Sequence, residues 1–111
     1  MTVFQQIIDG AIPCEKVYED EDVLAFNDIA PQAPVHILVV PKKPIESVAS
    51  AGPEDQLLLG KVMLVASAIA RRNGLAETGY RLVTNVGMGG GQTVFHLHVH
   101  IMGGRALRSM G

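Results

Sequence analysis

The alternation of three histidines with apolar residues constrains the fold of this chain more than any other feature. Residues 96–102 read His-Leu-His-Val-His-Ile-Met, so an imidazole occupies every second position. Successive side chains of a β-strand point to opposite faces. As a strand, the segment places the imidazoles in a row on one face and Leu97, Val99 and Ile101 on the other. Because the chain has 4 histidines in total, this clustering predicts one face for chemistry and one for a core.

The rest of the chain predicts short helices and strands around that segment. A helix over residues 2–9 begins at Thr2, whose hydroxyl can cap it, and ends before Gly10. The longest helix begins at Pro53 and ends at Asn73-Gly74, with apolar residues spaced for one helical face. Apolar runs predict strands over residues 16–19, 23–26, 35–40 and 80–85.

Length and hydrophobicity predict one small domain that leaves part of its apolar surface exposed. The chain has 111 residues, of which 48% are hydrophobic and 18% are charged. Such an excess on a small domain favours a subunit interface. Leu57, Met63 and Leu64 lie off the core face of the long helix, where they fit either additional core or a dimer face.

Charge and cysteine content limit the partners and the compartment. A net charge of −2 provides no basic footprint for nucleic acid or for an anionic membrane. The single cysteine, Cys14, fits a reducing compartment. The start of the chain does not resemble a secretory signal, and no apolar run reaches the roughly 18 residues of a membrane span. We therefore expect a cytoplasmic protein.

A zinc site is one interpretation of the histidine row, since imidazole is a common metal ligand. At about 3.3 Å per residue, the outer two imidazoles start roughly 13 Å apart, whereas ligand nitrogens lie about 2.0–2.1 Å from one ion. No carboxylate occurs between Asn85 and Gly111 to complete a set. One ion bound by all three histidines is disfavoured, and a structural row of hydrogen-bonded histidines is a second interpretation.

Nucleophilic catalysis is a third interpretation. A neutral imidazole can attack phosphorus and form a covalent intermediate that water then cleaves. The reaction needs one ring nitrogen free and the other held as a donor, often by a backbone carbonyl. Flanking imidazoles can donate to phosphate oxygens as charge develops. His98, with His96 and His100 on either side, is the natural nucleophile.

Three further features fit a phosphate or nucleotide ligand, and each has a plainer alternative. The run of glycines over residues 89–91, followed by Gln92 and Thr93, lets the backbone approach a ligand closely, although such runs are often only flexible turns. Asp28 follows a predicted strand and fits either a turn or an acceptor for a ribose hydroxyl. His36 fits either the core or an orienting contact with the histidine row.

The segment 96–102 resembles the His-φ-His-φ-His-φ-φ signature of the histidine triad (HIT) superfamily, in which φ is apolar. Residues 26–36, 40–44, 90–95 and 103–105 are similar to its nucleotide-binding branch and occur in the same order. The resemblance runs from about residue 3 to residue 105. It leads us to expect a single HIT domain over residues 1–111.

The resemblance implies an α+β fold with an antiparallel five-stranded sheet and two helices per subunit. Two subunits would join in a homodimer with a continuous ten-stranded sheet. The implied ligand is a purine nucleotide, and the implied reaction hydrolyses AMP or GMP phosphoramidates and acyl adenylates through a nucleotidyl-histidine intermediate. No metal or cofactor is implied.

The resemblance also assigns roles to individual residues. His98 matches the nucleophile, His96 and His100 its flanking members, with His100 facing the phosphate, and His36 the supporting histidine. The positions that match nucleotide contacts are Asn85, Gly91, Gln92 and Thr93 at the phosphate, Asp28 and the backbone of Ile29 at the ribose, and Phe4, Ile7, Phe26 and the side chain of Ile29 around the base.

Two details separate the branches of the superfamily. Nucleotidyl-transferase relatives carry glutamine at the position of His100, so His100 favours hydrolysis. Dinucleoside polyphosphate hydrolases share the full triad and stay an alternative, as does a nucleotide-binding scaffold with little catalysis. Residues 106–111 differ from the Trp-Pro-Pro-Gly tail of animal members, so they do not predict a preferred leaving group.

Overall fold

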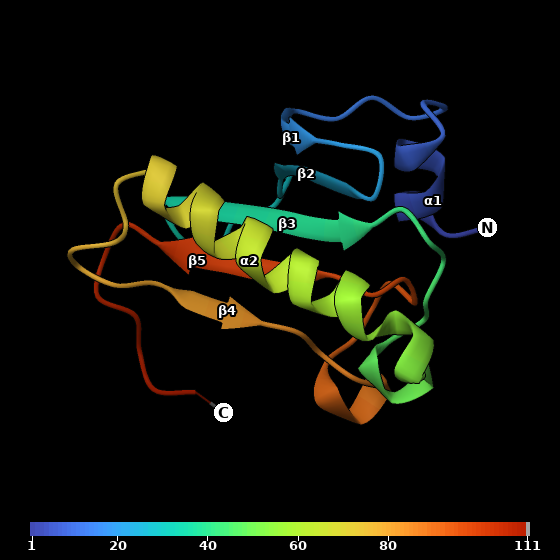
Figure 1. Cartoon of the computed structure of the whole chain (residues 1–111). Helices are drawn as coiled ribbons and strands as arrows, with labels where there is room; N and C mark the ends of the chain where they lie inside the picture. The colour runs from blue at the N-terminus through green and yellow to red at the C-terminus, as the bar shows by residue number, and fades with distance from the viewer. Residues whose placement is uncertain (111) are drawn as a thin grey trace.

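Five antiparallel strands form one sheet in the computed structural model, which describes residues 1–110 (Figure 1). The strands lie in the order β1-β2-β3-β5-β4. Their bounds are β1 (Lys16–Glu19), β2 (Val23–Asn27), β3 (Val35–Pro41), β4 (Arg81–Val83) and β5 (Val99–Gly103). Each neighbouring pair is antiparallel. The structure confirms the expected antiparallel five-stranded sheet.

Two α-helices complete the fold, α1 (Val3–Ile8) and α2 (Gln56–Arg72). The Thr2 hydroxyl accepts a hydrogen bond from the Gln5 amide at 3.1 Å, which is the predicted cap of α1. The predicted start of the long helix at Pro53 is a 3₁₀ turn, and the α-helix begins three residues later. Within residues 1–110, no helix is long and apolar enough to cross a membrane.

The two faces of the sheet carry two separate cores. The helix α2 runs across one face, in front of β3 and β5 (Figure 1), where it packs on Ile37, Val39, Val99 and Ile101. On the other face, Phe4 of α1 packs with Leu24, Phe26, Leu38 and Val40. Because side chains alternate along β3, His36 lies on the same face as Leu38. The α1 face of the sheet is therefore where the histidines gather.

The predicted histidine strand is shorter than expected. β5 begins at Val99, so His100 is the one triad member that lies inside the strand. The predicted strand over residues 80–85 is reduced to Arg81–Val83. At this point the His98 carbonyl accepts a hydrogen bond from the Thr84 hydroxyl at 2.8 Å. The Thr84 side chain thus takes the carbonyl that a backbone amide would otherwise bind, which is a physical reason for the pairing of β4 with β5 to stop here.

Candidate active site

Two adjoining cavities lie on the α1 face of the sheet. A polar cavity of about 410 Å³ contains His36 and Asn85 in its wall. An apolar cavity of about 370 Å³ lies beside it. The walls have four residues in common, which are Asp28, Thr93, His98 and His100. A ligand with an apolar part and a charged part could therefore occupy both cavities at once.

The backbone fixes the tautomer of His98. Its Nδ1 lies 2.7 Å from the carbonyl oxygen of His96. A carbonyl oxygen only accepts, so Nδ1 carries the hydrogen and Nε2 keeps the lone pair. The ring of Phe4 meets the imidazole edge-on at 4.9 Å between centroids, and the His98 side chain is buried. Burial lowers the pKa of His98 below its ordinary 6.5, so the ring is neutral at pH 7.

A second hydrogen-bonded chain fixes the tautomer of His100. The amide of Gln32 donates to Nδ1 of His36 at 3.0 Å. His36 is therefore neutral with its hydrogen on Nε2, which lies 2.9 Å from Nδ1 of His100. Since Nδ1 of His100 accepts this bond, Nε2 of His100 carries a hydrogen. Burial, followed by the neighbouring His98 and His36, lowers the pKa of His100 to about 4. His100 is thus a neutral donor.

These hydrogen bonds test whether the site suits a metal ion. Asp28, His36 and His100 bring three ligand atoms within 4.8 Å of one another, and the Asp28 Oδ2 lies 3.3 Å from Nε2 of His36. A metal needs lone pairs, whereas Nε2 of neutral His36 presents a hydrogen because the lone pair on Nδ1 already accepts from Gln32. The set fits a hydrogen-bonded network better than a cation. The loop after β2 brings Asp28, which is expected at a ribose hydroxyl, beside His36 and His100.

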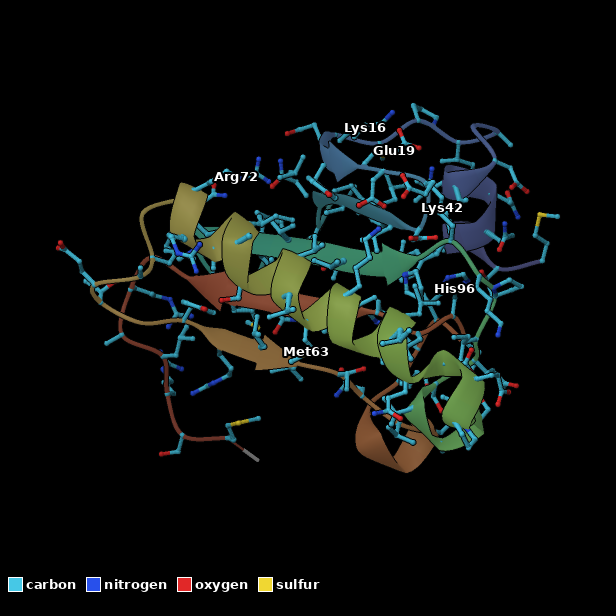
Figure 2. All side chains as sticks on the ribbon, viewed as in Figure 1. Lys16, Glu19, Lys42, Met63, Arg72 and His96 are labelled. Carbon is cyan, nitrogen blue, oxygen red and sulfur yellow. The ribbon has the colours of Figure 1, made fainter. Side chains whose placement is uncertain are left out.

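His96 contributes its backbone rather than its ring to the two cavities. The ring is 2% exposed, and its Nε2 donates to the carbonyl of Pro41 at 2.7 Å. Figure 2 shows His96 beyond the end of β3, near the loop that follows that strand. The ring lines a different cavity, which also contains Lys43 and Phe95. The contact of His96 with the site is its carbonyl bond to His98.

The glycine-rich loop is shaped by the side chain of Gln92. Its Oε1 accepts from the Gly87 amide at 2.9 Å, and its Nε2 donates to the carbonyls of Glu46 and Val94 at 2.8 and 3.0 Å. Gly87 adopts a φ of +73°, which favours glycine. Both amide hydrogens of this buried Gln92 side chain are used. The side chain therefore braces the loop, while the contact of this position with a phosphate stays a prediction.

The other predicted loop residues lie in the cavity walls. Asn85 and Gly91 line the polar cavity, and the Asn85 side chain donates to the Gly90 carbonyl at 2.7 Å. The exposed Thr93 lines both cavities. The Asp28 Oδ1 accepts from the Ala30 amide at 2.9 Å, and carboxylate oxygens keep further lone pairs for a ligand hydroxyl.

The predicted base-pocket residues line the apolar cavity together. Phe4, Ile7, Phe26 and Ile29 all contribute to its wall. Ile29 is 101% exposed, so its side chain lies in the wall without protein cover. The same wall includes Cys14 and Leu38, which the sequence did not single out. Leu38 could have been found from the strand alternation that places it with His36 on one face.

The arrangement is that of an α+β domain with histidines beside a glycine-rich loop, and the fold and sequence resemble those of known proteins. The HIT domain model matches residues 9–107. The purine nucleoside phosphoramidase of Escherichia coli is 47% identical over 109 residues, which span 98% of this chain and 92% of that protein. An uncharacterized HIT-like protein of Synechococcus elongatus is 57% identical over 106 residues, or 96% and 92% of the two chains.

Solved structures match the whole fold. A HIT family hydrolase from Legionella pneumophila has a TM-score of 0.95 at 45% identity, covering 97% of this chain and 96% of that one. A histidine triad protein from Clostridium difficile has a TM-score of 0.93 at 44% identity, covering 98% and 95%. The chain belongs to the HIT domain family. Its relatives support hydrolase activity in general terms.

Proposed function

We propose that the chain hydrolyses purine nucleoside phosphoramidates and acyl adenylates, with His98 as the nucleophile. The observation that carries this proposal is the tautomer of His98. Its Nδ1–H is held by the His96 carbonyl at 2.7 Å, and its lowered pKa keeps the ring neutral. A neutral imidazole with a free lone pair on Nε2 is the form that can attack phosphorus.

The reaction has two steps. Nε2 of His98 attacks the α-phosphorus, the bond from phosphorus to the amine breaks, and the amine takes a proton from solvent water as it leaves. With an acyl adenylate, the carboxylate leaves as the anion and needs no proton. Water then attacks the nucleotidyl-histidine and gives up a proton to the solvent, which releases the nucleoside monophosphate and regenerates the neutral ring. Nε2–H of His100 donates to a phosphate oxygen, where negative charge grows in each transition state. The hydroxyl of Thr93, the side chain of Asn85 and the backbone at Gly91 lie in the same polar wall.

The two cavities support a nucleotide as the ligand. The base fits the apolar cavity between Phe4, Phe26 and Ile29, because aromatic and aliphatic walls accept the faces of a purine. Asp28 belongs to both cavities, which supports a role for its carboxylate as the acceptor of a ribose hydroxyl between base and phosphate. The name of the Escherichia coli relative, purine nucleoside phosphoramidase, supports the same substrate class.

The test compares His98→Ala with the unchanged protein on an AMP–amine conjugate. We expect turnover to fall by at least about 10³-fold, while AMP binding measured by calorimetry changes little. Mass spectrometry after a rapid alkaline quench should detect an adenylylated protein only when His98 is present. Glu77→Gln, an exposed change in the turn after α2, is a control that should leave turnover unchanged. Undiminished turnover by His98→Ala would refute the proposal.

Two alternatives make different predictions in the same assay. A dinucleoside polyphosphate hydrolase would cleave dinucleotides faster than phosphoramidates or acyl adenylates. A nucleotide-binding scaffold would bind AMP and turn over none of the three substrates. A comparison of kcat/KM across the three substrate classes separates these outcomes.

We also propose that the chain forms a homodimer. β4 is an edge strand of the sheet, and the neighbouring α2 exposes Leu57, Met63 and Leu64. Figure 2 shows Met63 on the side of α2 toward β4. Pairing of two β4 edges would extend the sheet to about ten strands and cover these apolar side chains. Light scattering at micromolar concentration tests this, and a species of only 11.8 kDa would contradict it.

A further inference from the structure

We propose that Arg105 is a positioning residue for His100, acting through the main chain of Gln32 and the ring of His36. The guanidinium Nη2 of Arg105 donates to the carbonyl oxygen of Gln32 at 3.0 Å. The amide of the same Gln32 donates to Nδ1 of His36 at 3.0 Å. The effect of Arg105 on turnover rests on the proposed function. Its effect on the tautomers of His36 and His100 rests on the hydrogen-bond geometry alone.

The direction of the His36 ring hydrogen decides what His100 can offer a ligand. With the Gln32 amide on Nδ1, neutral His36 must carry its hydrogen on Nε2 and donate to Nδ1 of His100. His100 then presents Nε2–H. If His36 instead carried its hydrogen on Nδ1, His100 would have to donate from its own Nδ1, and its Nε2 would present a lone pair. A lone pair repels a phosphate oxygen, whereas an N–H binds it.

The backbone bond to His36 depends on an exposed loop that is anchored at its start, where the Asp28 amide donates to the His36 carbonyl at 3.0 Å. Gln32 is exposed, as are Ile29, Ala30 and Pro31 before it. The Asp28 carboxylate fixes the start of the loop at the Ala30 amide, 2.9 Å away. The Arg105 guanidinium reaches the loop from the segment that follows β5.

The hydrogen bond from Arg105 therefore connects the segment just after β5, the strand of His100, to the loop of Gln32 that sets the tautomer of His100. Gly104 makes this approach possible, because it adopts a φ of +94° and its missing Cβ would lie 2.8 Å from the Cβ of Pro34. The turn at Gly104 brings Arg105 back over the loop immediately after β5 ends at Gly103. The hydrogen bonds thus run from Arg105 to Gln32, from Gln32 to His36, and from His36 to His100.

The test removes the guanidinium and reads the tautomers directly. In Arg105→Ala, nitrogen NMR of ¹⁵N-labelled histidines should show His36 and His100 losing their uniform Nε2–H state, and kcat/KM on the AMP–amine conjugate should fall by about 10-fold. Arg105→Lys keeps one cationic donor and should restore part of both signals. Arg108→Ala removes the same charge three residues later and should change neither.

The outcomes separate this inference from the proposed function. Unchanged tautomers in Arg105→Ala would overturn it, and so would altered tautomers with unchanged kcat/KM. Arg105→Gln repeats the measurement if the alanine variant does not give a folded amide spectrum. If His98→Ala retains turnover, the proposed function fails, whereas the tautomers of His36 and His100 still test the structural link to Arg105.

Discussion

The imidazole of His98 is oriented by the carbonyl of His96, two residues earlier in the same segment, at 2.7 Å. Because this bond is local, the ring does not depend on a carboxylate from another element for its orientation. The polar contact is thus a backbone group, which a side-chain substitution cannot remove. The rings of Phe4 and His100 pack against it, at 4.9 and 5.0 Å between ring centroids.

The pH dependence of turnover should reflect the lowered pKa of His98. Protonation occupies the lone pair on Nε2 and stops the attack. Because burial lowers the pKa below the ordinary 6.5, the acidic fall of kcat/KM on an acyl adenylate should have its midpoint below pH 6.5. An NMR titration of the His98 ring is the direct check. A midpoint at or above 6.5 would contradict the assignment.

Replacement of Phe4 should affect stability and chemistry together. Phe4 is 7% exposed and packs edge-on against both Phe26 and His98. Phe4→Ala should lower the free energy of unfolding by about 3–5 kcal/mol, as measured in urea. It should also raise the pKa of His98 toward 6.5, because water reaches the ring. Phe4→Leu keeps most of the volume and should show both effects weakly, while a His98 pKa unaffected by Phe4→Ala would disprove the link.

Gln92 should matter for the loop rather than for contact with the phosphate. Gln92→Ala leaves the Gly87 amide and the Glu46 and Val94 carbonyls without their partner, which should cost about 1–3 kcal/mol of unfolding free energy. Thr93→Ala, at the next and exposed position, should leave stability unchanged and raise KM. If Gln92→Ala has full stability but weakened AMP binding, the side chain contacts ligand after all.

Chelation of metal ions should leave turnover unchanged. His36 and His100 are joined by a hydrogen bond, the Asp28 carboxylate lies 3.3 Å from His36, and His36 presents an N–H where a metal would need a lone pair. Assays with and without EDTA on the same preparation should give equal kcat/KM. Activity that disappears with EDTA and returns with zinc would show that the histidines bind a metal ion required for turnover.

The sequence predicts the elements whose signals are local and periodic. The apolar stripe of α2, the Thr2 cap and the alternation around His100 all follow from spacing, and each is present in the structure. The resemblance to the histidine triad superfamily adds the antiparallel five-stranded sheet and leads us to expect Asp28 and His36 in the site. Both arrive beside His100 from the β2–β3 region.

The sequence could not predict contacts that the backbone makes. The Gln32 amide that orients His36 belongs to a residue whose side chain has no part in the contact. Gln92 resembles a ligand-binding position by its place in the motif, yet its hydrogen bonds are all to the main chain. The His96 ring lies apart from the two cavities because β5 begins only at Val99, so the alternation of a strand does not reach His96. The alternation of residue types along the sequence does not reveal where that strand begins.

The fully exposed side chain of Ile29 has a thermodynamic consequence. Water covers this part of the apolar cavity until a ligand arrives, and a purine seated there would release that water. Burial of apolar surface gives a negative change in heat capacity on binding. The enthalpy of AMP binding should therefore become more favourable as temperature rises, with a shallower slope in Ile29→Ser, so calorimetry across a temperature series can identify where the base lies.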